Sequence, residues 1–203
     1  MKIYDFPLAP NPRRVRIFLA EKNIEMVYVH IDIFKGENQT AEFIEKNPLG
    51  KLPVLEFDDG TYLTESVAIC RYFEGMYPNP PLMGVDPRDI AFVEMWNRRM
   101  ELEIFLPMVD VFVHCHPFWI GKREQIPAYG ELLRRQVIAR MQWLDGELAQ
   151  RPYIAGDTYG IADITAQVAL LTARGALKLP IPEEQKNLTR WWAAVSARPS
   201  ARA

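Results

Sequence analysis

Strand-type patterns occur only within the first 64 residues, and this restriction limits the possible folds more than any other feature of the sequence. Short alternating runs rich in β-branched and aromatic residues predict strands at 2–6, 26–32, 52–57 and 61–64. Helical spacing predicts helices at 11–23, 40–47 and 65–77, which gives the order βαβαββα. Because a helix joins the first two strands, we expect them to be parallel with a right-handed connection. The Asp-Asp-Gly turn predicts an antiparallel hairpin after them.

The pattern changes after residue 77. The stretch PNPPLMGVDP at 78–87 breaks every periodicity and is typical of a linker. Beyond it, helical patterns run over 88–115, 124–149, 160–175 and 184–197. We therefore predict an α/β domain over 1–77, a linker over 78–87 and an all-helical domain over 88–203. A cleft between two such domains is the expected place for a ligand.

Composition argues against several classes of partner. The formal net charge of −2 gives no overall attraction to nucleic acid or to acidic membranes, and no apolar run approaches the length that spans a bilayer. The two cysteines, Cys70 and Cys115, are far apart and lie in helical patterns. This usage suits the reducing cytoplasm better than a disulfide framework, so we expect a cytoplasmic protein.

The Pro-Asn-Pro stretch at 10–12 opens the first predicted helix. We expect Asn11 to be its N-cap and Pro12 its first residue, where a missing N–H costs nothing. Arg13 and Arg14 then place positive charge in the first turn, where it opposes the helix dipole. This unfavourable choice indicates an anion nearby.

Four stretches together resemble the cytosolic glutathione transferases: PNPRRVRIFLAEKNI at 10–24, NPLGKLPVL at 47–55, LTESVAICRYF at 63–73 and PYIAGDTYGIADITA at 152–166. They occur in the family's order and spacing from one end of the chain to the other. The resemblance implies a thioredoxin-like α/β domain followed by the family's all-helical domain. It also implies glutathione as co-substrate, a homodimer and a role in detoxification.

The TESV stretch offers a site for the γ-glutamyl end of glutathione. Glu65 can accept from the ammonium group, while Ser66 and the free N–H groups of the helix that it opens can hold the carboxylate. A plain capping pair is the competing interpretation. The neighbouring Leu-Pro of the preceding strand favours the binding role.

The KLPVL stretch offers sites for the rest of the tripeptide. In the resembled family this proline is cis, so Pro53 is expected to be cis and to expose the backbone of Leu52 to the cysteinyl residue. Lys51 is expected to meet the glycyl carboxylate, although a solvated surface lysine is an equally simple interpretation. The alignment of DIFKGENQ with the family places Asn38 near the same carboxylate.

The usual donors to the glutathione sulfur are missing. Tyrosine-type families carry Tyr directly before Phe-Pro, where this chain has Asp5, and Tyr4 belongs on the other face of the strand. Serine-type families carry Ser where this chain has Ala9, and no Cys occurs in the loop.

The remaining donors at this place belong to Asn11. Its oxygen can cap the helix while its NH₂ group points at the thiolate, and the flanking prolines hold that geometry. We therefore expect Asn11 to be the main thiolate donor, supported by Arg13 or Arg14, since only one of the two arginines can face the cleft. The competing interpretation is a plain N-cap in a protein that activates glutathione poorly.

The pocket for the electrophile is expected in the helical half, in the aromatic and Met-rich stretch at 103–119. The candidates are Phe105, Met108, Phe112, His116 and Trp119, at least half of which we expect to be core residues. His114 and His116 do not share a helix face and have no partner cluster, so we expect no metal site. Asp163 is expected at the third position of a buried helix that Gly160 caps, reaching back to that cap.

The main prediction is a glutathione transferase that adds the thiolate to hydrophobic electrophiles. A glutathione-dependent isomerase, disulfide reductase or peroxidase is the second possibility. The third is a binding or regulatory module that has kept the fold and lost activity, for which Ala9 is the best support.

Overall fold

The computed structural model describes residues 1–203 and divides them into two compact units. Unit 1 comprises Met1–Leu82 together with Pro199–Ala203, and unit 2 comprises Met83–Arg198. The sequence pattern assigns 199–203 to the helical half, whereas the backbone returns to unit 1 there. None of the helices combines the length and the apolar character needed to cross a bilayer.

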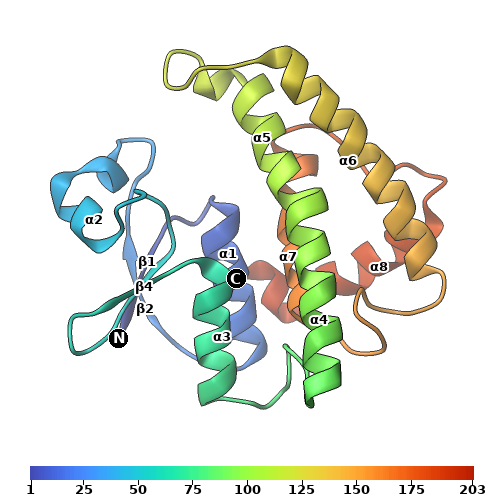
Figure 1. The fold of residues 1–203 in the computed structure, drawn as a ribbon, viewed down its shortest axis with the longest axis horizontal. Helices are drawn as coiled ribbons and strands as arrows, with labels where there is room; N and C mark the ends of the chain where they lie inside the picture. The colour runs from blue at the N-terminus through green and yellow to red at the C-terminus, as the bar shows by residue number, and fades with distance from the viewer. The chain divides into compact units, whose positions relative to one another are not determined.

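Unit 1 is built on a four-stranded sheet with the order β2-β1-β3-β4 (Figure 1). The strand β1 (Lys2–Asp5) pairs in parallel with β2 (Val27–His30). On its other side β1 pairs antiparallel with β3 (Val54–Glu56), which forms a hairpin with β4 (Tyr62–Thr64). The predicted parallel pair and the predicted hairpin are both confirmed.

Helices cover both faces of this sheet (Figure 1). Helices α1 (Pro10–Glu21) and α3 (Ser66–Met76) pack against each other, while α2 (Ala41–Lys46) lies on the opposite side after the short helix η1 (Glu37–Gln39). The C-terminal turn η4 (Pro199–Arg202) packs against α1. The first domain therefore has the predicted βαβαββα order, with a C-terminal addition that the pattern does not reveal.

The α2 face of the sheet is held by a small apolar cluster. Tyr4 of β1 and Val54 of β3 pack with Phe43 of α2, and the Tyr4 and Phe43 rings meet edge to face. Thr40 caps α2 by accepting a hydrogen bond from the Phe43 N–H. Tyr4 thus points to the α2 side, as the alternation along the strand predicts.

The chain that leaves α3 is anchored by a buried lysine. The Lys22 side chain is 0% exposed and forms an ion pair of 2.7 Å with Glu74. Its Nζ also donates to the carbonyl oxygens of Tyr77 and Pro80, at 2.7 and 2.8 Å. One cation thereby ties the end of α1 to the segment that follows α3.

Unit 2 is entirely helical. Its elements are α4 (Pro87–Met100), the π-helical turn η2 (Glu101–Phe105), α5 (Leu106–Cys115), η3 (Pro117–Trp119), α6 (Pro127–Leu148), α7 (Ile161–Gly175) and α8 (Lys186–Ser196). The single helix predicted over 88–115 is interrupted by the wide turn η2. Pro107 explains the interruption, because its ring removes one hydrogen bond and crowds the carbonyl four residues earlier.

Helix α7 forms the centre of unit 2, and its N-terminus is closed as predicted. Residues 161–170 are all buried. Gly160 is the N-cap, and the Asp163 carboxylate accepts from the Gly160 N–H at 3.0 Å. Asp163 also accepts from the Ile154 N–H at 3.0 Å and from the Trp191 indole N–H at 2.7 Å. This carboxylate therefore ties α7 to α8 and to the loop before α7.

Candidate functional site

The Pro-Asn-Pro stretch forms the first turn of α1, but the helix begins earlier than the pattern predicts. Ala9 is the N-cap and Pro10 is the first helical residue, so the prediction that Asn11 caps the helix is wrong. The fixed φ of Pro10 already suits the first helical position, which moves Asn11 into the turn. Because Pro10 and Pro12 lack an N–H, Asn11 contributes the only backbone N–H among the first three helical positions.

Asn11, Arg14 and Ser66 form one hydrogen-bonded network between α1 and α3. Arg14 Nη1 donates to Ser66 Oγ at 2.7 Å and to Asn11 Oδ1 at 3.2 Å. The Ser66 hydroxyl lies 3.3 Å from Asn11 Oδ1 and donates to it. Because guanidinium only donates, the network fixes the Asn11 oxygen toward Arg14. Both hydrogen bonds of the Asn11 side chain use Oδ1, so its NH₂ group has no acceptor within the chain.

The two arginines of the first turn have different surroundings. Arg14 is 1% exposed and joins the network described above. Arg13 donates from Nη2 to the Ala201 carbonyl oxygen at 3.0 Å, which ties α1 to the C-terminal turn. Burial, with a smaller effect of the Arg16 charge, lowers the pKa of Arg13. Of the two arginines, Arg14 is the one whose side chain donates a hydrogen bond to Asn11.

The sequence could have indicated that Arg14 is buried. Arg14 precedes Ile17 and Phe18 by three and four residues, so all three lie on one helix face, and both apolar residues are 0% exposed. A buried arginine requires acceptors. What sequence reasoning missed is that one of these acceptors is Ser66, which lies 52 positions away.

Glu65 precedes α3 in an unusual backbone conformation. Its φ of 67° and ψ of 114° lie outside the regions that L-residues normally adopt. The side chain is exposed and makes no capping hydrogen bond. Strained non-glycine residues of this kind concentrate at functional sites. The strained Glu65 is exposed to solvent, whereas its neighbour Ser66 is buried and accepts a hydrogen bond from Arg14.

The segment before β3 has the expected backbone. The Leu52–Pro53 peptide bond is cis, as the resemblance implies. Leu52 is partly buried against the Tyr4 cluster, and no hydrogen bond within the chain uses its N–H or C=O. Its main chain is therefore available to an extended peptide.

Lys51 and Asn38 lie near this segment, and they differ in whether the side chain is already hydrogen-bonded. The Lys51 side chain is exposed, while its carbonyl oxygen accepts from Asn47 Nδ2 at 2.7 Å. Asn38 donates from Nδ2 to the Gly50 carbonyl oxygen at 2.7 Å, beside a second donor from Gln39. The Asn38 amide nitrogen thus already supports the turn at Gly50.

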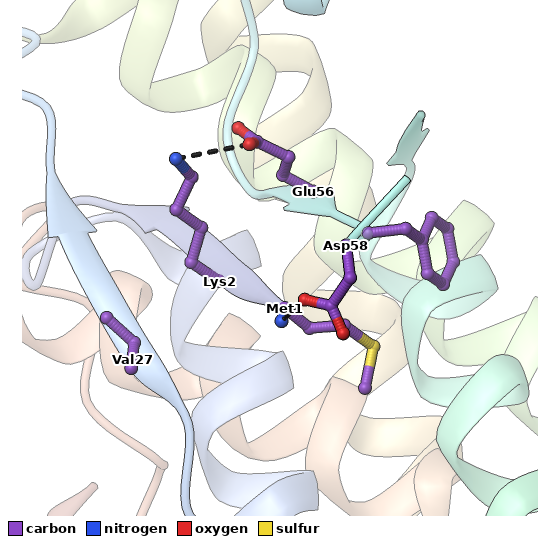
Figure 2. Close-up of a pocket in the computed structure, with 6 residues that line it drawn as sticks. Met1, Lys2, Val27, Glu56 and Asp58 are labelled. Atoms are coloured by element: carbon purple, nitrogen blue, oxygen red, sulfur yellow. Dashed lines mark hydrogen bonds and ion pairs between the residues drawn. The ribbon is translucent and has the colours of Figure 1, made fainter. Parts of the chain in front are cut away.

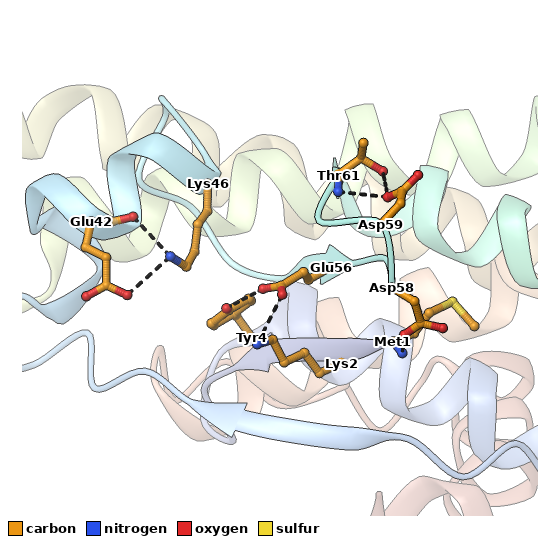
Figure 3. Close-up of polar contacts among 9 residues, drawn as sticks. All are labelled: Met1, Lys2, Tyr4, Glu42, Lys46, Glu56, Asp58, Asp59 and Thr61. Atoms are coloured by element: carbon orange, nitrogen blue, oxygen red, sulfur yellow. Dashed lines mark hydrogen bonds and ion pairs between the residues drawn. The ribbon is translucent and has the colours of Figure 1, made fainter.

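The other polar side chains of β1 are also occupied. Tyr4 donates to Glu56 at 2.6 Å, and Glu56 pairs with Lys2 at 3.1 Å (Figure 3). Asp5, in the position of the tyrosine-type donor, forms an ion pair with Arg16 of α1. Burial raises the pKa of Asp5 in spite of this partner. Neither side chain is a free donor for a thiolate.

The predicted residues for the electrophile separate into two groups within unit 2. Phe105 and Met108 are 1% and 0% exposed, so they are core residues. Phe112, His116 and Trp119 are partly exposed and meet, with ring centroids 4.6 Å apart for Phe112–His116 and 6.1 Å apart for Phe112–Trp119. These three residues form an aromatic cluster at the end of α5.

The histidines near this cluster bond to the backbone. His114 Nδ1 accepts from the Ile126 N–H at 3.1 Å, and His116 Nδ1 accepts from the Phe118 N–H at 3.2 Å. His116 lies just beyond α5 and not on it, so helical spacing does not apply to this pair. No group of three or more metal-ligating side chains is arranged to hold an ion.

A shallow groove in unit 1 does not belong to this site. It has a volume of about 340 Å³ and is lined by Met1, Lys2, Val27, Glu56, Phe57 and Asp58 (Figure 2). The Met1 ammonium group pairs with Asp58, and Lys2 pairs with Glu56. No residue predicted to bind glutathione lines it, and its charges are already neutralised in pairs.

Comparison with known proteins decides the family. Residues 3–81 match the family model described as "Glutathione S-transferase, N-terminal domain", and residues 108–199 match "Glutathione S-transferase, C-terminal domain". This chain belongs to the glutathione S-transferase family. Glutathione S-transferase 2 of Saccharomyces cerevisiae is 39% identical over 209 residues, covering 100% of this chain and 88% of that protein.

Solved transferase structures give the same result. The crystal structure of Gtt2 from Saccharomyces cerevisiae is 39% identical, with a TM-score of 0.94 over 100% of this chain and 99% of that one. A glutathione S-transferase domain-containing protein from Marinobacter aquaeolei is 38% identical, with a TM-score of 0.92 over 98% and 99%. The fold predicted from the transferase resemblance is therefore confirmed.

Proposed function

We propose that this chain is a glutathione transferase in which the Asn11 amide stabilises the glutathione thiolate for attack on hydrophobic electrophiles. The observation that carries this role is the orientation of the amide. Arg14 and Ser66 hold Oδ1, so the NH₂ group and the adjacent backbone N–H of Asn11 remain as donors at the start of α1. The relatives named above are called transferases, which favours this function over the isomerase, reductase, peroxidase and binding-module alternatives.

The energetic requirement on these donors is modest. A free thiol has a pKa near 8.5, and lowering it by about two units requires about 2.7 kcal/mol of preferential stabilisation of the anion. A hydrogen bond to a charged group contributes about 1.5–3 kcal/mol. Two donors from Asn11 at the positive end of α1 are therefore sufficient. With the thiolate formed, attack on the electrophile needs no covalent intermediate on the protein.

The other residues are assigned to the tripeptide by their availability. Glu65 is exposed and free to accept from the γ-glutamyl ammonium group, and Ser66 begins α3 beside it to meet the carboxylate. The unused N–H and C=O of Leu52, beside cis-Pro53, suit pairing with the cysteinyl residue. The exposed Lys51 suits the glycyl carboxylate. Asn38 contributes indirectly, because it holds the turn at Gly50.

The electrophile is assigned to the aromatic cluster of Phe112, His116 and Trp119. Its rings are partly exposed and offer flat apolar surfaces. Phe105 and Met108 support the cluster from the core of unit 2, and substitutions there are expected to affect stability before activity.

The thiolate assignment is tested by replacing Asn11 with Ala and with Asp. The pKa of enzyme-bound glutathione is followed through the ultraviolet absorbance of the thiolate. Asn11→Ala removes the side-chain donor and keeps the backbone N–H, so it should raise that pKa by about one unit or more, and the carboxylate of Asn11→Asp should raise it further by repulsion. A bound-thiol pKa that is unchanged in both variants contradicts the proposal.

We also propose a cytoplasmic homodimer. Both cysteines are free thiols, which suits a reducing compartment. The start of unit 2 exposes apolar side chains, with Phe92 and Leu102 each 48% exposed, and such surface suits contact with a second copy. Light scattering on a size-exclusion column tests the dimer, and a monomeric mass at micromolar concentration contradicts it.

A further inference from the structure

Arg14 lies between two groups that the proposed function assigns to different parts of glutathione. Asn11 is assigned to the sulfur and Ser66 to the γ-glutamyl carboxylate. A single nitrogen atom, Arg14 Nη1, donates to both side chains, at 3.2 and 2.7 Å. This nitrogen carries two hydrogens, one for each acceptor. The orientations of both binding groups therefore depend on the position of one guanidinium group.

The surroundings of Arg14 favour a fixed position. The side chain is 1% exposed, and a guanidinium group in the interior is held in place by its acceptors. Cys70 of α3 is fully buried in the same region and its electrostatics include the Arg14 charge. Burial raises the pKa of Cys70 to about 12, so this thiol stays neutral and is no counter-ion. Arg14 Nη1 thus donates to two neutral groups, the Asn11 amide oxygen and the Ser66 hydroxyl.

We propose that Arg14 is a positioning residue that couples the sulfur subsite to the γ-glutamyl subsite. It orients the Asn11 amide toward the sulfur, and it holds Ser66 Oγ so that the hydroxyl, which donates to Asn11 Oδ1 in this structure, turns to the γ-glutamyl carboxylate when glutathione binds. The inference rests on the proposed function. Its consequence is a specific pattern of kinetic effects. Loss of Asn11 raises the bound-thiol pKa, loss of Ser66 raises the glutathione KM, and a change at Arg14 raises both.

A direct effect of charge predicts a different pattern. The positive charge of Arg14 by itself lowers the pKa of a nearby thiol, whatever the orientation of Asn11. Arg14→Lys separates the two effects, because lysine keeps the charge and lacks the planar fork that reaches two acceptors. Positioning predicts that lysine fails to replace arginine, whereas a pure charge effect predicts that it succeeds.

The experiment compares Asn11→Ala, Ser66→Ala, Arg14→Lys and the double variant Asn11→Ala/Arg14→Lys with the unaltered enzyme. Arg71→Lys, which changes an exposed arginine of α3, is the matched control. Steady-state kinetics with a chloronitrobenzene give the glutathione KM, and thiolate absorbance gives the bound-thiol pKa. Circular dichroism and thermal unfolding confirm that each variant is folded.

We expect Arg14→Lys to raise the glutathione KM by about tenfold and to raise the thiol pKa nearly as much as Asn11→Ala does. In the Asn11→Ala background, Arg14→Lys should raise the pKa no further, because its effect passes through the missing amide. Additive pKa shifts, or an Arg14→Lys enzyme with an unaltered pKa, overturn the inference. If Asn11→Ala itself leaves the pKa unchanged, the proposed function of Asn11 fails first.

A measurement without substitution at Arg14 covers the case in which Arg14→Lys does not fold. γ-Glutamylmethylamide carries the carboxylate and ammonium group of the γ-glutamyl end and has no thiol. Its titration into the unaltered protein is followed by the NMR signals of the Asn11 side-chain NH₂ group. Coupling predicts that these signals move at saturation, and signals that stay in place overturn the inference.

Discussion

Trp191 donates its indole N–H to Asp163 over 2.7 Å, inside unit 2 and across 28 positions of sequence. Trp191 lies on α8 and Asp163 lies in the first turn of α7, so the bond joins the last long helix to the most deeply buried one. Both side chains are 0% exposed. Three N–H donors, from Ile154, Gly160 and Trp191, therefore converge on this buried carboxylate.

Asp163→Ala should lower the free energy of unfolding by about 3 kcal/mol or more, because it leaves buried N–H donors without an acceptor. Denaturant unfolding measures the change. Asp157→Ala is the control, because Asp157 is exposed in the loop before α7, and it should stay within about 0.5 kcal/mol. Equal losses in the two variants would contradict the role of Asp163.

The contribution of Asp163 should also depend on pH. Burial raises the pKa of Asp163 from 3.8 to about 6, so the folded protein binds the proton more tightly than the unfolded chain. Stability from this group is therefore present at low pH and is lost as pH rises toward about 6. The stability difference between the unaltered protein and Asp163→Ala should shrink by about 1 kcal/mol from about pH 5 to about pH 7. A difference that grows with pH would show that the three donors outweigh burial.

Glu65 should contribute to glutathione binding more than to stability. Glu65→Gln keeps the size and the unusual backbone conformation and removes the charge, so the glutathione KM should rise about tenfold with little change in unfolding. Glu65→Gly should give the same rise in KM. Glycine relieves the backbone strain at φ 67°, but it also increases the conformational entropy of the unfolded chain. These two effects oppose each other, so the free energy of unfolding should stay within about 1 kcal/mol of the unaltered value. An unaltered KM in both variants argues against the assignment to the ammonium group.

Lys22 should be essential for the segment that follows α3. Lys22→Met removes a buried cation from Glu74 and from two carbonyl oxygens, and should cost about 3–5 kcal/mol of unfolding free energy. Lys35→Met removes an exposed lysine from its ion pair with Asp32 and should cost about 0.5 kcal/mol or less. Chemical denaturation of both variants checks the contrast, and similar costs would refute it.

Replacing each of two glycines of α6 with alanine should have opposite effects on the stability of the protein. A Cβ at Gly130 would lie 2.3 Å from Cys115 Sγ, because α5 and α6 approach closely there, so Gly130→Ala should destabilise the protein by about 1–3 kcal/mol. A Cβ at Gly146 meets nothing within 4 Å, so Gly146→Ala should stabilise by up to about 1 kcal/mol. Cys115→Ala should partly rescue Gly130→Ala. Thermal unfolding of the variants tests the pair, and a stabilised Gly130→Ala variant is the contrary outcome.

The sequence by itself determined the elements whose signals are local. Alternation predicts the strands, and a crossover helix makes the first pair parallel. Gly160 and Asp163 predict their own capping arrangement, because a cap requires only residues a few positions apart. The resemblance supplied cis-Pro53. Local patterns predict the ends of elements less well. Pro10 and Pro12 both suit the first position of a helix, so the sequence does not distinguish Asn11 from Ala9 as the N-cap.

Only the tertiary structure decided which side chains meet. Sequence reasoning placed Arg14 with the thiol and Ser66 with the carboxylate, and it offered Arg13 as an equal choice. The packing of α3 on α1 joins Arg14 to Ser66, while the returning C-terminal segment occupies Arg13. Hydrogen bonds between residues far apart in the chain depend on the position of whole helices. Such positions result from burial of many side chains at once, which no local pattern specifies.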